Sequence, residues 1–249
     1  MTKGIGEYSG RKHALINQLV SMQVARALTF LPPGSRVLVV DMHAGDSAGA
    51  KAIQPDLFAG DESRATPWVA IDAAERMRRN GMLCDLLLFE RSHKARTELT
   101  TRLAGLDLRI SGNHERLLKA NGLDQYAFAI VLNDPNGPGR HGDRVLAYLA
   151  KAIRRCDFII VVNEGSLQRL AGVSDEQAAG SFAANVAAAR DGHLWRLDAA
   201  EWAWRLERRF ALRSRMLIGN TAMKARLLLI TNAPPMRTPP NFTKIEVQR

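Results

Sequence analysis

The sequence predicts an α/β fold in which helices cover both faces of a mostly parallel sheet. Short apolar runs recur along the chain, and segments with helical periodicity separate them. This alternation is typical of βαβ units. Near the end, two strand-like runs are joined only by GNTAMKA, which is too short for a parallel crossover. The expected sheet is therefore parallel and finishes with an antiparallel hairpin.

The parallel part of the sheet is predicted from five runs. A leading helix is expected from His13 to Phe30, because its apolar residues form one stripe that ends before Pro32-Pro33-Gly34. Buried strands are then expected at Val37 to Val40, Asp85 to Phe89, Leu106 to Ser111, Ala127 to Leu132 and Phe158 to Val162. The intervening helices are expected at Thr66 to Arg79, Ser92 to Leu103, Asn113 to Ala120 and Asp143 to Arg155.

After Gly165 the pattern changes. An alanine-rich helix is expected from Asp175 to Arg190, and the hairpin strands from Arg208 to Ile218 and from Arg226 to Thr231. Residues 1–232 are therefore expected to form one domain. The segment 233–249 is rich in proline, and we expect it to be an extended C-terminal tail.

Composition narrows the class of protein. The 249 residues are 46% hydrophobic and 24% charged, which are ordinary globular values. No apolar run approaches the roughly 18 residues of a membrane span, and no apolar signal region follows the N-terminus, so we expect a cytoplasmic protein. Cys84 and Cys156 precede apolar runs and are expected in the core. The histidines lack metal-ligand spacing, so no metal site is expected.

The formal net charge of +10 favours a polyanionic partner, and nucleic acid is the expected one. A basic stretch interleaved with tryptophans suits base stacking beside phosphate contacts, although the aromatics could equally face the core. The residues expected to contact nucleic acid are Arg140, His141, Arg208, Arg209, Arg213 and Arg215.

Each predicted parallel strand ends in an acid or an amide. Strand one ends at Asp41, strand two at Glu90, and strand three near Asn113. Strand four runs out into the loop Asn133-Asp134-Pro135-Asn136, which is followed by glycines and prolines. Because ligands of open parallel sheets bind outside the carboxyl ends of the strands, we expect these residues to surround a ligand.

The turn after strand one, DMHAGDSAG, restricts the class of ligand. Gly45 and Gly49 allow the backbone to approach a ligand closely, but Ser47 interrupts the dinucleotide-binding glycine pattern. Asp41 and Asp46 would repel a pyrophosphate, which disfavours NAD and ATP. S-adenosylmethionine fits, because its sulfonium and amino groups are positive. The alternative is an ordinary strand-to-helix corner in which Asp41 caps the next helix.

The stretches DMHAGDSAGA, LLLFERS and IVLNDPNGPG together resemble the class I S-adenosylmethionine-dependent methyltransferases, and most of all the three-Cys-motif partner family. The resemblance covers residues 8–232 and includes the leading GRKHALINQLV. It implies a Rossmann-like sheet with strand order 3-2-1-4-5-7-6. It also implies a methyltransferase that acts on nucleic acid, with DNA favoured over RNA.

The resemblance further implies roles for individual residues. Asp41, Ala44, Gly45 and Gly49 would line the methionine side of the cofactor, together with His43 and Ser47 in the same turn. Glu90 would hold the ribose, and Asn113 would lie near the adenine. Asp134 and Pro135 would face the transferred methyl group, and Asn133 or Asn136 would hydrogen-bond the target.

Three departures from the family pattern keep a second interpretation open. His43 replaces an aromatic residue, Ser47 replaces a glycine, and Asn136 replaces the aromatic residue that stacks on a flipped base. The alternative is therefore a catalytically degenerate methyltransferase-like protein that binds nucleic acid or a protein partner without turnover. The sequence leaves the methylated atom and the oligomeric state open, including a partner protein or a second copy of the chain.

Overall fold

Runs of valine, isoleucine, leucine and phenylalanine form one mixed sheet in the computed structural model, which describes residues 7–45, 66–134, 143–163, 174, 215–221, 225–231 and 242–245. The strand order is β3-β2-β1-β4-β5-β7-β6-β8. The strands are β1 (Arg36–Asp41), β2 (Leu83–Phe89), β3 (Arg109–Ser111), β4 (Phe128–Asn133), β5 (Cys156–Asn163), β6 (Arg215–Thr221), β7 (Ala225–Thr231) and β8 (Phe242–Ile245).

The predicted strand order is confirmed, and the tail adds one strand to it. Strands β1 to β5 pair in parallel, whereas β7 pairs antiparallel with both β5 and β6. Residues 242–245 of the expected tail form β8, which pairs antiparallel with β6. The four-residue run Phe242–Ile245 lies among prolines and polar residues, which is why its sequence gives a weak strand signal. The domain boundary after residue 232 stays a prediction.

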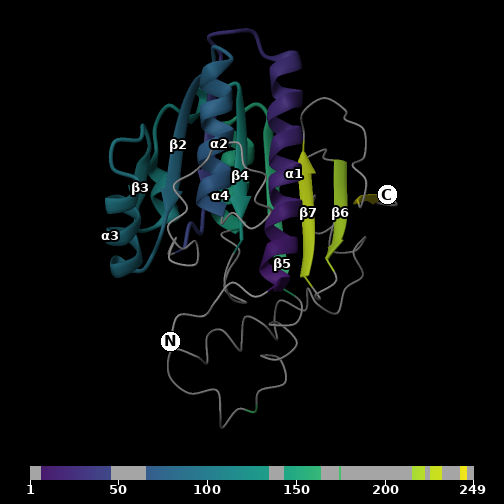
Figure 1. Cartoon of the computed structure of the whole chain (residues 1–249). Helices are drawn as coiled ribbons and strands as arrows, with labels where there is room; N and C mark the ends of the chain where they lie inside the picture. Colours follow the sequence, from purple (N-terminus) through teal and green to yellow (C-terminus); the bar gives the residue numbers. More distant parts are fainter. Residues whose placement is uncertain are drawn as a thin grey trace.

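Helices cover both faces of the sheet, as expected. The α-helices are α1 (Glu7–Phe30), α2 (Thr66–Arg79), α3 (His93–Arg102) and α4 (Asp143–Ala152). Helices α1 and α2 lie side by side in front of the sheet (Figure 1). The segment expected as a helix from Asn113 to Ala120 is a 3₁₀-helix, η2 (His114–Lys119), followed by a second one, η3 (Leu123–Gln125). The helix expected from Asp175 to Arg190 lies outside the described residues.

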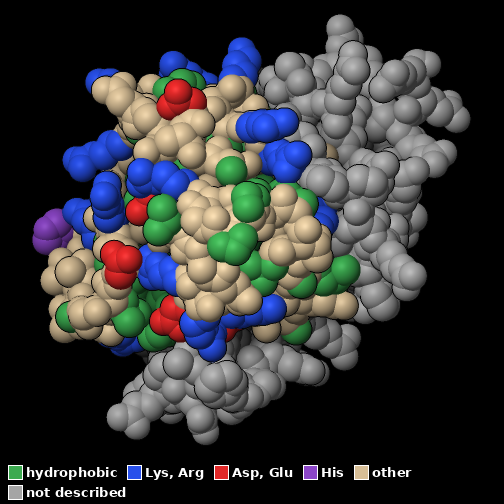
Figure 2. Space-filling model, turned by 90° about the horizontal axis from the view of Figure 1, so that it is seen from above, with side chains coloured by type: hydrophobic (Ala, Val, Ile, Leu, Met, Phe, Trp, Pro, Cys, Tyr) green, Lys and Arg blue, Asp and Glu red, His purple; other side chains and the backbone are tan. Residues whose placement is uncertain are grey.

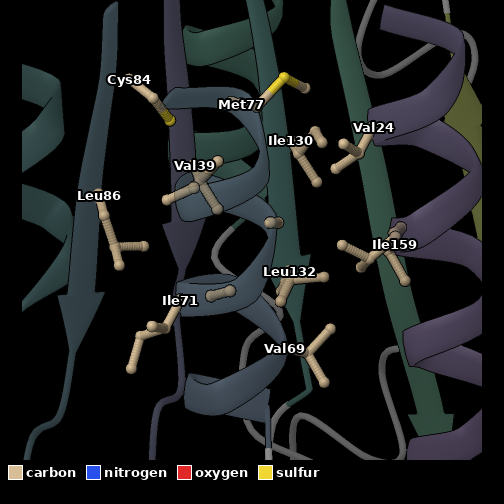
Figure 3. Packing of buried hydrophobic residues seen from close by; sticks show 14 of the residues in the cluster. Val24, Val39, Val69, Ile71, Met77, Cys84, Leu86, Ile130, Leu132 and Ile159 are labelled. Atoms are coloured by element: carbon tan, nitrogen blue, oxygen red, sulfur yellow. The ribbon is translucent and has the colours of Figure 1, made fainter. Parts of the chain in front are cut away.

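Alternation along the strands divides the core into two layers. On β1, Val37 and Val39 pack in the layer beneath α1, α2 and α3, whereas Leu38 and Val40 pack in the layer beneath α4 and the two 3₁₀-helices. In the first layer, side chains of α2 point toward β1 and β4, and side chains of α1 point toward β5 (Figure 3). Both cysteines are buried in these layers, which confirms their prediction as core residues.

A buried polar cluster ties α1 to the place where the parallel and antiparallel parts of the sheet meet. Arg26 of α1 forms an ion pair with Asp157 of β5 and donates a hydrogen bond to the Thr231 hydroxyl of β7 at 3.1 Å. Asp157 and Thr231 are direct neighbours across the two strands. Burial raises the pKa of Asp157 to about 6, while the Arg26 guanidinium and the Thr231 hydroxyl oppose that rise.

Replacing Arg26 should therefore leave a buried carboxylate without its cation. We expect Arg26→Met to lower the free energy of unfolding by about 3 kcal/mol near neutral pH. Without the guanidinium, the folded-state pKa of Asp157 rises further above its unfolded value. The loss should therefore grow as pH rises through about 6 to about 8. Urea unfolding at several pH values measures this change.

The matched control is Arg76→Met, because Arg76 pairs with Asp72 at 3.9 Å in a partly exposed position on α2. That pair should contribute about 0.5 kcal/mol or less. The double variant Arg26→Met, Asp157→Leu should recover most of the stability, since it removes the unpaired charge as well. If the unfolding free energy lost in Arg26→Met did not change with pH, the unpaired Asp157 carboxylate would not be the cause of the loss.

Candidate functional site

Three carboxylates meet at the carboxyl edge of β1, β2 and β4. Asp41, the last residue of β1, lies opposite Leu88 of β2 and Leu132 of β4. Glu90 and Asp134 follow two residues after these partners. Leu88, Leu132 and the β1 residue Val39 belong to the core layer beneath α1 and α2. Because side chains on a strand repeat with a period of two, the carboxylates continue that apolar stripe at one rim.

Asp41 is the most buried member of the site. Its side chain is 0% exposed, and its Oδ1 accepts a hydrogen bond from the His43 amide at 3.0 Å. The Thr66 hydroxyl also hydrogen-bonds to this carboxyl. Within the part of the chain that the structure describes, Asp41 Oδ2 has no hydrogen-bond partner.

The electrostatic surroundings of Asp41 include the other two carboxylates. Burial raises the pKa of Asp41 to about 7, and the His43 amide and the Thr66 hydroxyl oppose this effect. The negative charges of Asp134 and Glu90 raise the pKa further. Among the described residues, the charged side chains that act on Asp41 are therefore acidic, and this arrangement favours a positively charged group.

Backbone hydrogen bonds join the residues that follow β1 to both neighbouring strands. The Met42 amide donates to the Leu132 carbonyl at 3.0 Å, and the Ala44 amide donates to the Phe89 carbonyl at 2.9 Å. Gly45 then adopts a left-handed conformation with φ of 66°. A side chain would strain this conformation, so glycine is required where the chain turns away from the rim.

Glu90 stands at the end of β2 with its backbone fixed to β3. Its amide donates to the Ser111 carbonyl at 2.9 Å, and its Oε1 accepts from the Ser92 amide. Ser92 in turn caps α3, because its hydroxyl accepts from the Ala95 amide at 3.3 Å. The half-buried Glu90 carboxylate is therefore held by the loop that starts α3.

Asn113 lies at the outer part of this edge and is exposed. Its Oδ1 accepts from the Glu115 amide at 2.8 Å and so caps η2. The next residue, His114, places its ring 5.4 Å from the ring of His43 and 6.4 Å from that of Phe89. Burial lowers the pKa of His114, which favours its neutral form.

The structure brings together seven of the predicted site residues at this rim. They are Asp41, His43, Ala44, Gly45, Glu90, Asn133 and Asp134. Asn133 is fully buried, and Asp134 is 7% exposed. The predicted residues Ser47, Gly49, Pro135, Asn136, Arg140, His141, Arg208, Arg209 and Arg213 lie outside the described residues.

Arg215 is placed away from the rim. It starts β6 opposite Thr231, which in turn pairs with Asp157 near the start of β5. It is therefore level with the beginnings of the parallel strands, at the edge opposite Asp41. Its proposed contact with nucleic acid stays a prediction, but the contact would not be adjacent to the carboxylates.

Sequence reasoning missed two residues of the site, Thr66 and His114. Thr66 starts α2 immediately before Pro67, a recognisable helix-start signal, but nothing in the sequence links it to Asp41. His114 follows the predicted Asn113, yet its contact with His43 depends on the unexpected 3₁₀ geometry of η2.

The edge from which the parallel strands start is seen from above in Figure 2, where Lys and Arg side chains exceed Asp and Glu. Several of these cations already have partners. Arg36 lies 3.4 Å from Asp85, and Arg78 lies 3.1 Å from Asp107. Others end helices, where they offset the helix dipole, as Arg79 does in α2 and Arg102 in α3.

Among the residues that the structure describes, no group of histidine, cysteine and acidic side chains is arranged to hold a metal ion. Within these ranges, none of the helices has the length and apolarity of a membrane span.

Comparison with solved structures supports the fold. The chain is similar to protein LPL1258 from Legionella pneumophila str. Philadelphia 1, with a TM-score of 0.51 and 12% identity over 92% of this chain and 87% of that one. It is similar to the DszA carbon methyltransferase, with a TM-score of 0.50 and 9% identity over 88% of this chain and 53% of that one. At these identities the likeness shows a methyltransferase-like fold.

No protein-family model matches the sequence, and no curated protein matches it. The resemblance to the three-Cys-motif partner family therefore stays a prediction. The confirmed features are the class of fold and the strand order.

The burial of Asp41 predicts a pH-dependent stability. Its folded-state pKa of about 7 exceeds the unfolded value of 3.8, so the folded protein holds this proton more tightly. The contribution of Asp41 to stability is therefore greatest below the unfolded pKa, falls as pH rises toward about 7, and is constant above it. We expect Asp41→Asn to become progressively more stable than the parent protein between about pH 4 and about pH 7, and the difference to stay constant at higher pH.

Thermal unfolding of the two proteins across this pH range measures the difference. Asp72→Asn, on a partly exposed position of α2, controls for the removal of a carboxylate from the same region. Parallel pH profiles for Asp41→Asn and the parent protein would show that Asp41 does not titrate abnormally.

Proposed function

We propose that this protein binds S-adenosylmethionine at the carboxyl edge of β1, β2 and β4 and transfers its methyl group to a nucleic-acid nucleophile. The observation that supports this most directly is the fully buried Asp41, with one oxygen lacking a partner among the described residues and with Glu90 and Asp134 nearby. The β1 and β4 strands are neighbours at the topological switch point, where open α/β sheets bind ligands.

The chemistry of the site favours this cofactor over phosphate-bearing ones. Three carboxylates repel a pyrophosphate, whereas a ligand with a sulfonium and an ammonium group lowers their mutual repulsion. Bound S-adenosylmethionine would supply an electrophilic methyl group. Asp41 would face the positive part of the ligand, and Glu90, at the end of β2, would accept hydrogen bonds from the ribose hydroxyls.

The substrate side of the site is proposed around Asp134. This residue follows β4 at the same rim and is largely buried. It would orient the target amine or accept its proton, and the adjacent buried Asn133 would hydrogen-bond the target. Pro135 and Asn136 would continue this wall. Most of the rate would come from positioning the two reactants.

The net charge of +10 supports a nucleic-acid substrate, with DNA favoured. Arg140 and His141 would contact phosphates beside the Asp134 loop, and Arg208, Arg209 and Arg213 would extend this contact. The likeness to the DszA carbon methyltransferase supports methyl transfer as the class of reaction.

Calorimetry with S-adenosylmethionine tests the cofactor. We expect Asp41→Asn and Glu90→Gln each to weaken binding by roughly 10-fold or more, because each removes a hydrogen bond to a charged group. Binding to the parent protein should weaken as pH falls below about 7, because protonated Asp41 no longer attracts a cation. Gly45→Arg should abolish binding by strain and obstruction.

The matched control is Glu98→Gln on α3, another partly buried glutamate. It should bind the cofactor as the parent protein does. Absence of binding to the parent protein at millimolar cofactor, together with salt-sensitive binding of DNA, would instead identify the degenerate methyltransferase-like protein.

Transfer of a labelled methyl group to DNA and RNA tests the substrate. We expect Asp134→Asn to retain most of the cofactor affinity and to lose roughly 100-fold or more in transfer rate, the magnitude typical of general acid-base groups. Cofactor binding without transfer to either nucleic acid would overturn the substrate assignment while leaving the cofactor assignment intact.

A further inference from the structure

We propose that Thr66, the first residue of α2, is a positioning residue that fixes the Asp41 carboxylate for a cationic ligand. The inference rests on the proposed function only for the identity of that ligand. It assigns a role to a residue that lies 25 positions beyond Asp41 in the chain.

The location of Thr66 is set by the helix and the core. Thr66 is 6% exposed, and α2 presents a continuous buried face that includes Val69, Ile71 and Met77. These residues pack in the same core layer as Val39 of β1 (Figure 3). The start of α2 is therefore held against the end of β1 by apolar contacts that do not depend on the intervening turn.

Two groups hold the Asp41 carboxyl by hydrogen bonds. The His43 amide donates to Oδ1 at 3.0 Å, and the Thr66 hydroxyl donates to the carboxyl from the opposite segment of chain. The amide belongs to the backbone, so the hydroxyl is the donor that a side-chain change can remove. The remaining oxygen, Oδ2, is buried and lacks a hydrogen-bond partner among the described residues, which leaves it available to a ligand.

The charged groups that face Asp41 make this donor important. Asp134 acts on it from the end of β4 and Glu90 from the end of β2, and both are negative. The ring of His43, in the same turn, contacts His114 of η2. Burial and both acids favour the protonated form of Asp41, whereas the two hydrogen bonds favour the ionised form that attracts a cation.

The N-terminus of α2 acts in the same direction. A helix of this length carries partial positive charge at its first turn, which stabilises a nearby carboxylate. The hydroxyl of Thr66 adds a directed bond to this general effect. Removal of the hydroxyl should therefore change the ionisation of Asp41 while the helix and its packing remain.

The experiment compares Thr66→Val, which keeps the shape and removes the donor, with Thr66→Ser, which keeps the donor. Carbon NMR of the labelled Asp41 carboxyl is followed through a pH titration without any cofactor. We expect the midpoint to rise by roughly half to one pH unit in Thr66→Val and to stay at the parent value in Thr66→Ser. Thr66→Ala should raise it similarly, and serves if the valine variant does not fold.

A second readout follows S-adenosylmethionine binding at two pH values. We expect Thr66→Val to bind roughly twofold to fivefold more weakly at about pH 7 and nearly as well as the parent protein at about pH 9, where Asp41 is ionised in both. A merely structural defect would weaken binding equally at both values. Thr100→Val on α3, where the hydroxyl bonds the Arg96 carbonyl, is the control for loss of a threonine hydroxyl.

The outcomes separate this inference from the proposed function. An unchanged Asp41 midpoint in both Thr66→Val and Thr66→Ala, or a serine variant that titrates as the valine variant does, would overturn the role of Thr66. A shifted midpoint in a protein that binds no S-adenosylmethionine at either pH would support that role and reject the proposed cofactor.

Discussion

The arrangement of the rim depends on one electrostatic constraint, the burial of Asp41 beside two other acids. A carboxylate that is removed from water and surrounded by like charges is unfavourable unless a hydrogen-bond donor or a cation compensates it. Here the backbone amide of His43 and the hydroxyl of Thr66 compensate it in part. The nearby charges of Asp134 and Glu90 favour a positively charged group beside Asp41.

The rigid parts of the fold explain how such a site persists. Asp41 ends a strand that pairs on both sides, and the two residues that follow it are bonded to β4 and β2. At the other edge, the ion pair of Arg26 and Asp157 satisfies a buried charge within the protein itself. The two buried aspartates therefore contrast: Asp157 has its cation in α1, whereas the donors to Asp41 among the described residues are neutral.

The sequence predicted the sheet well because its signals are local and redundant. Apolar runs, turn residues and the short GNTAMKA connection predicted the five parallel strands and the final hairpin. The acids at the strand ends could be placed together because parallel strands share one carboxyl edge. The roles of Thr66 and His114 could not be predicted in this way, because each depends on a contact between segments that only the packed structure brings together.

Two residues show that a side chain of a suitable type need not be available at the place where it was expected to act. Asn113 was expected near the ligand. It is exposed, and its side-chain oxygen caps η2, so its side-chain NH₂ group is what remains for other contacts. Arg215 was grouped with other arginines by composition, yet the antiparallel register carries it to the opposite edge. The edge of the sheet at which such a residue lies depends on strand direction, which composition does not specify.

The pairing of β8 with β6 has a consequence for how separate molecules of this protein meet. An uncovered outer strand offers a row of backbone donors and acceptors on which another chain can assemble. Residues 242–245 occupy that row on β6 with a short segment of the same chain that contains Lys244. This segment therefore protects the antiparallel side of the sheet from intermolecular strand addition and from the aggregation that can follow.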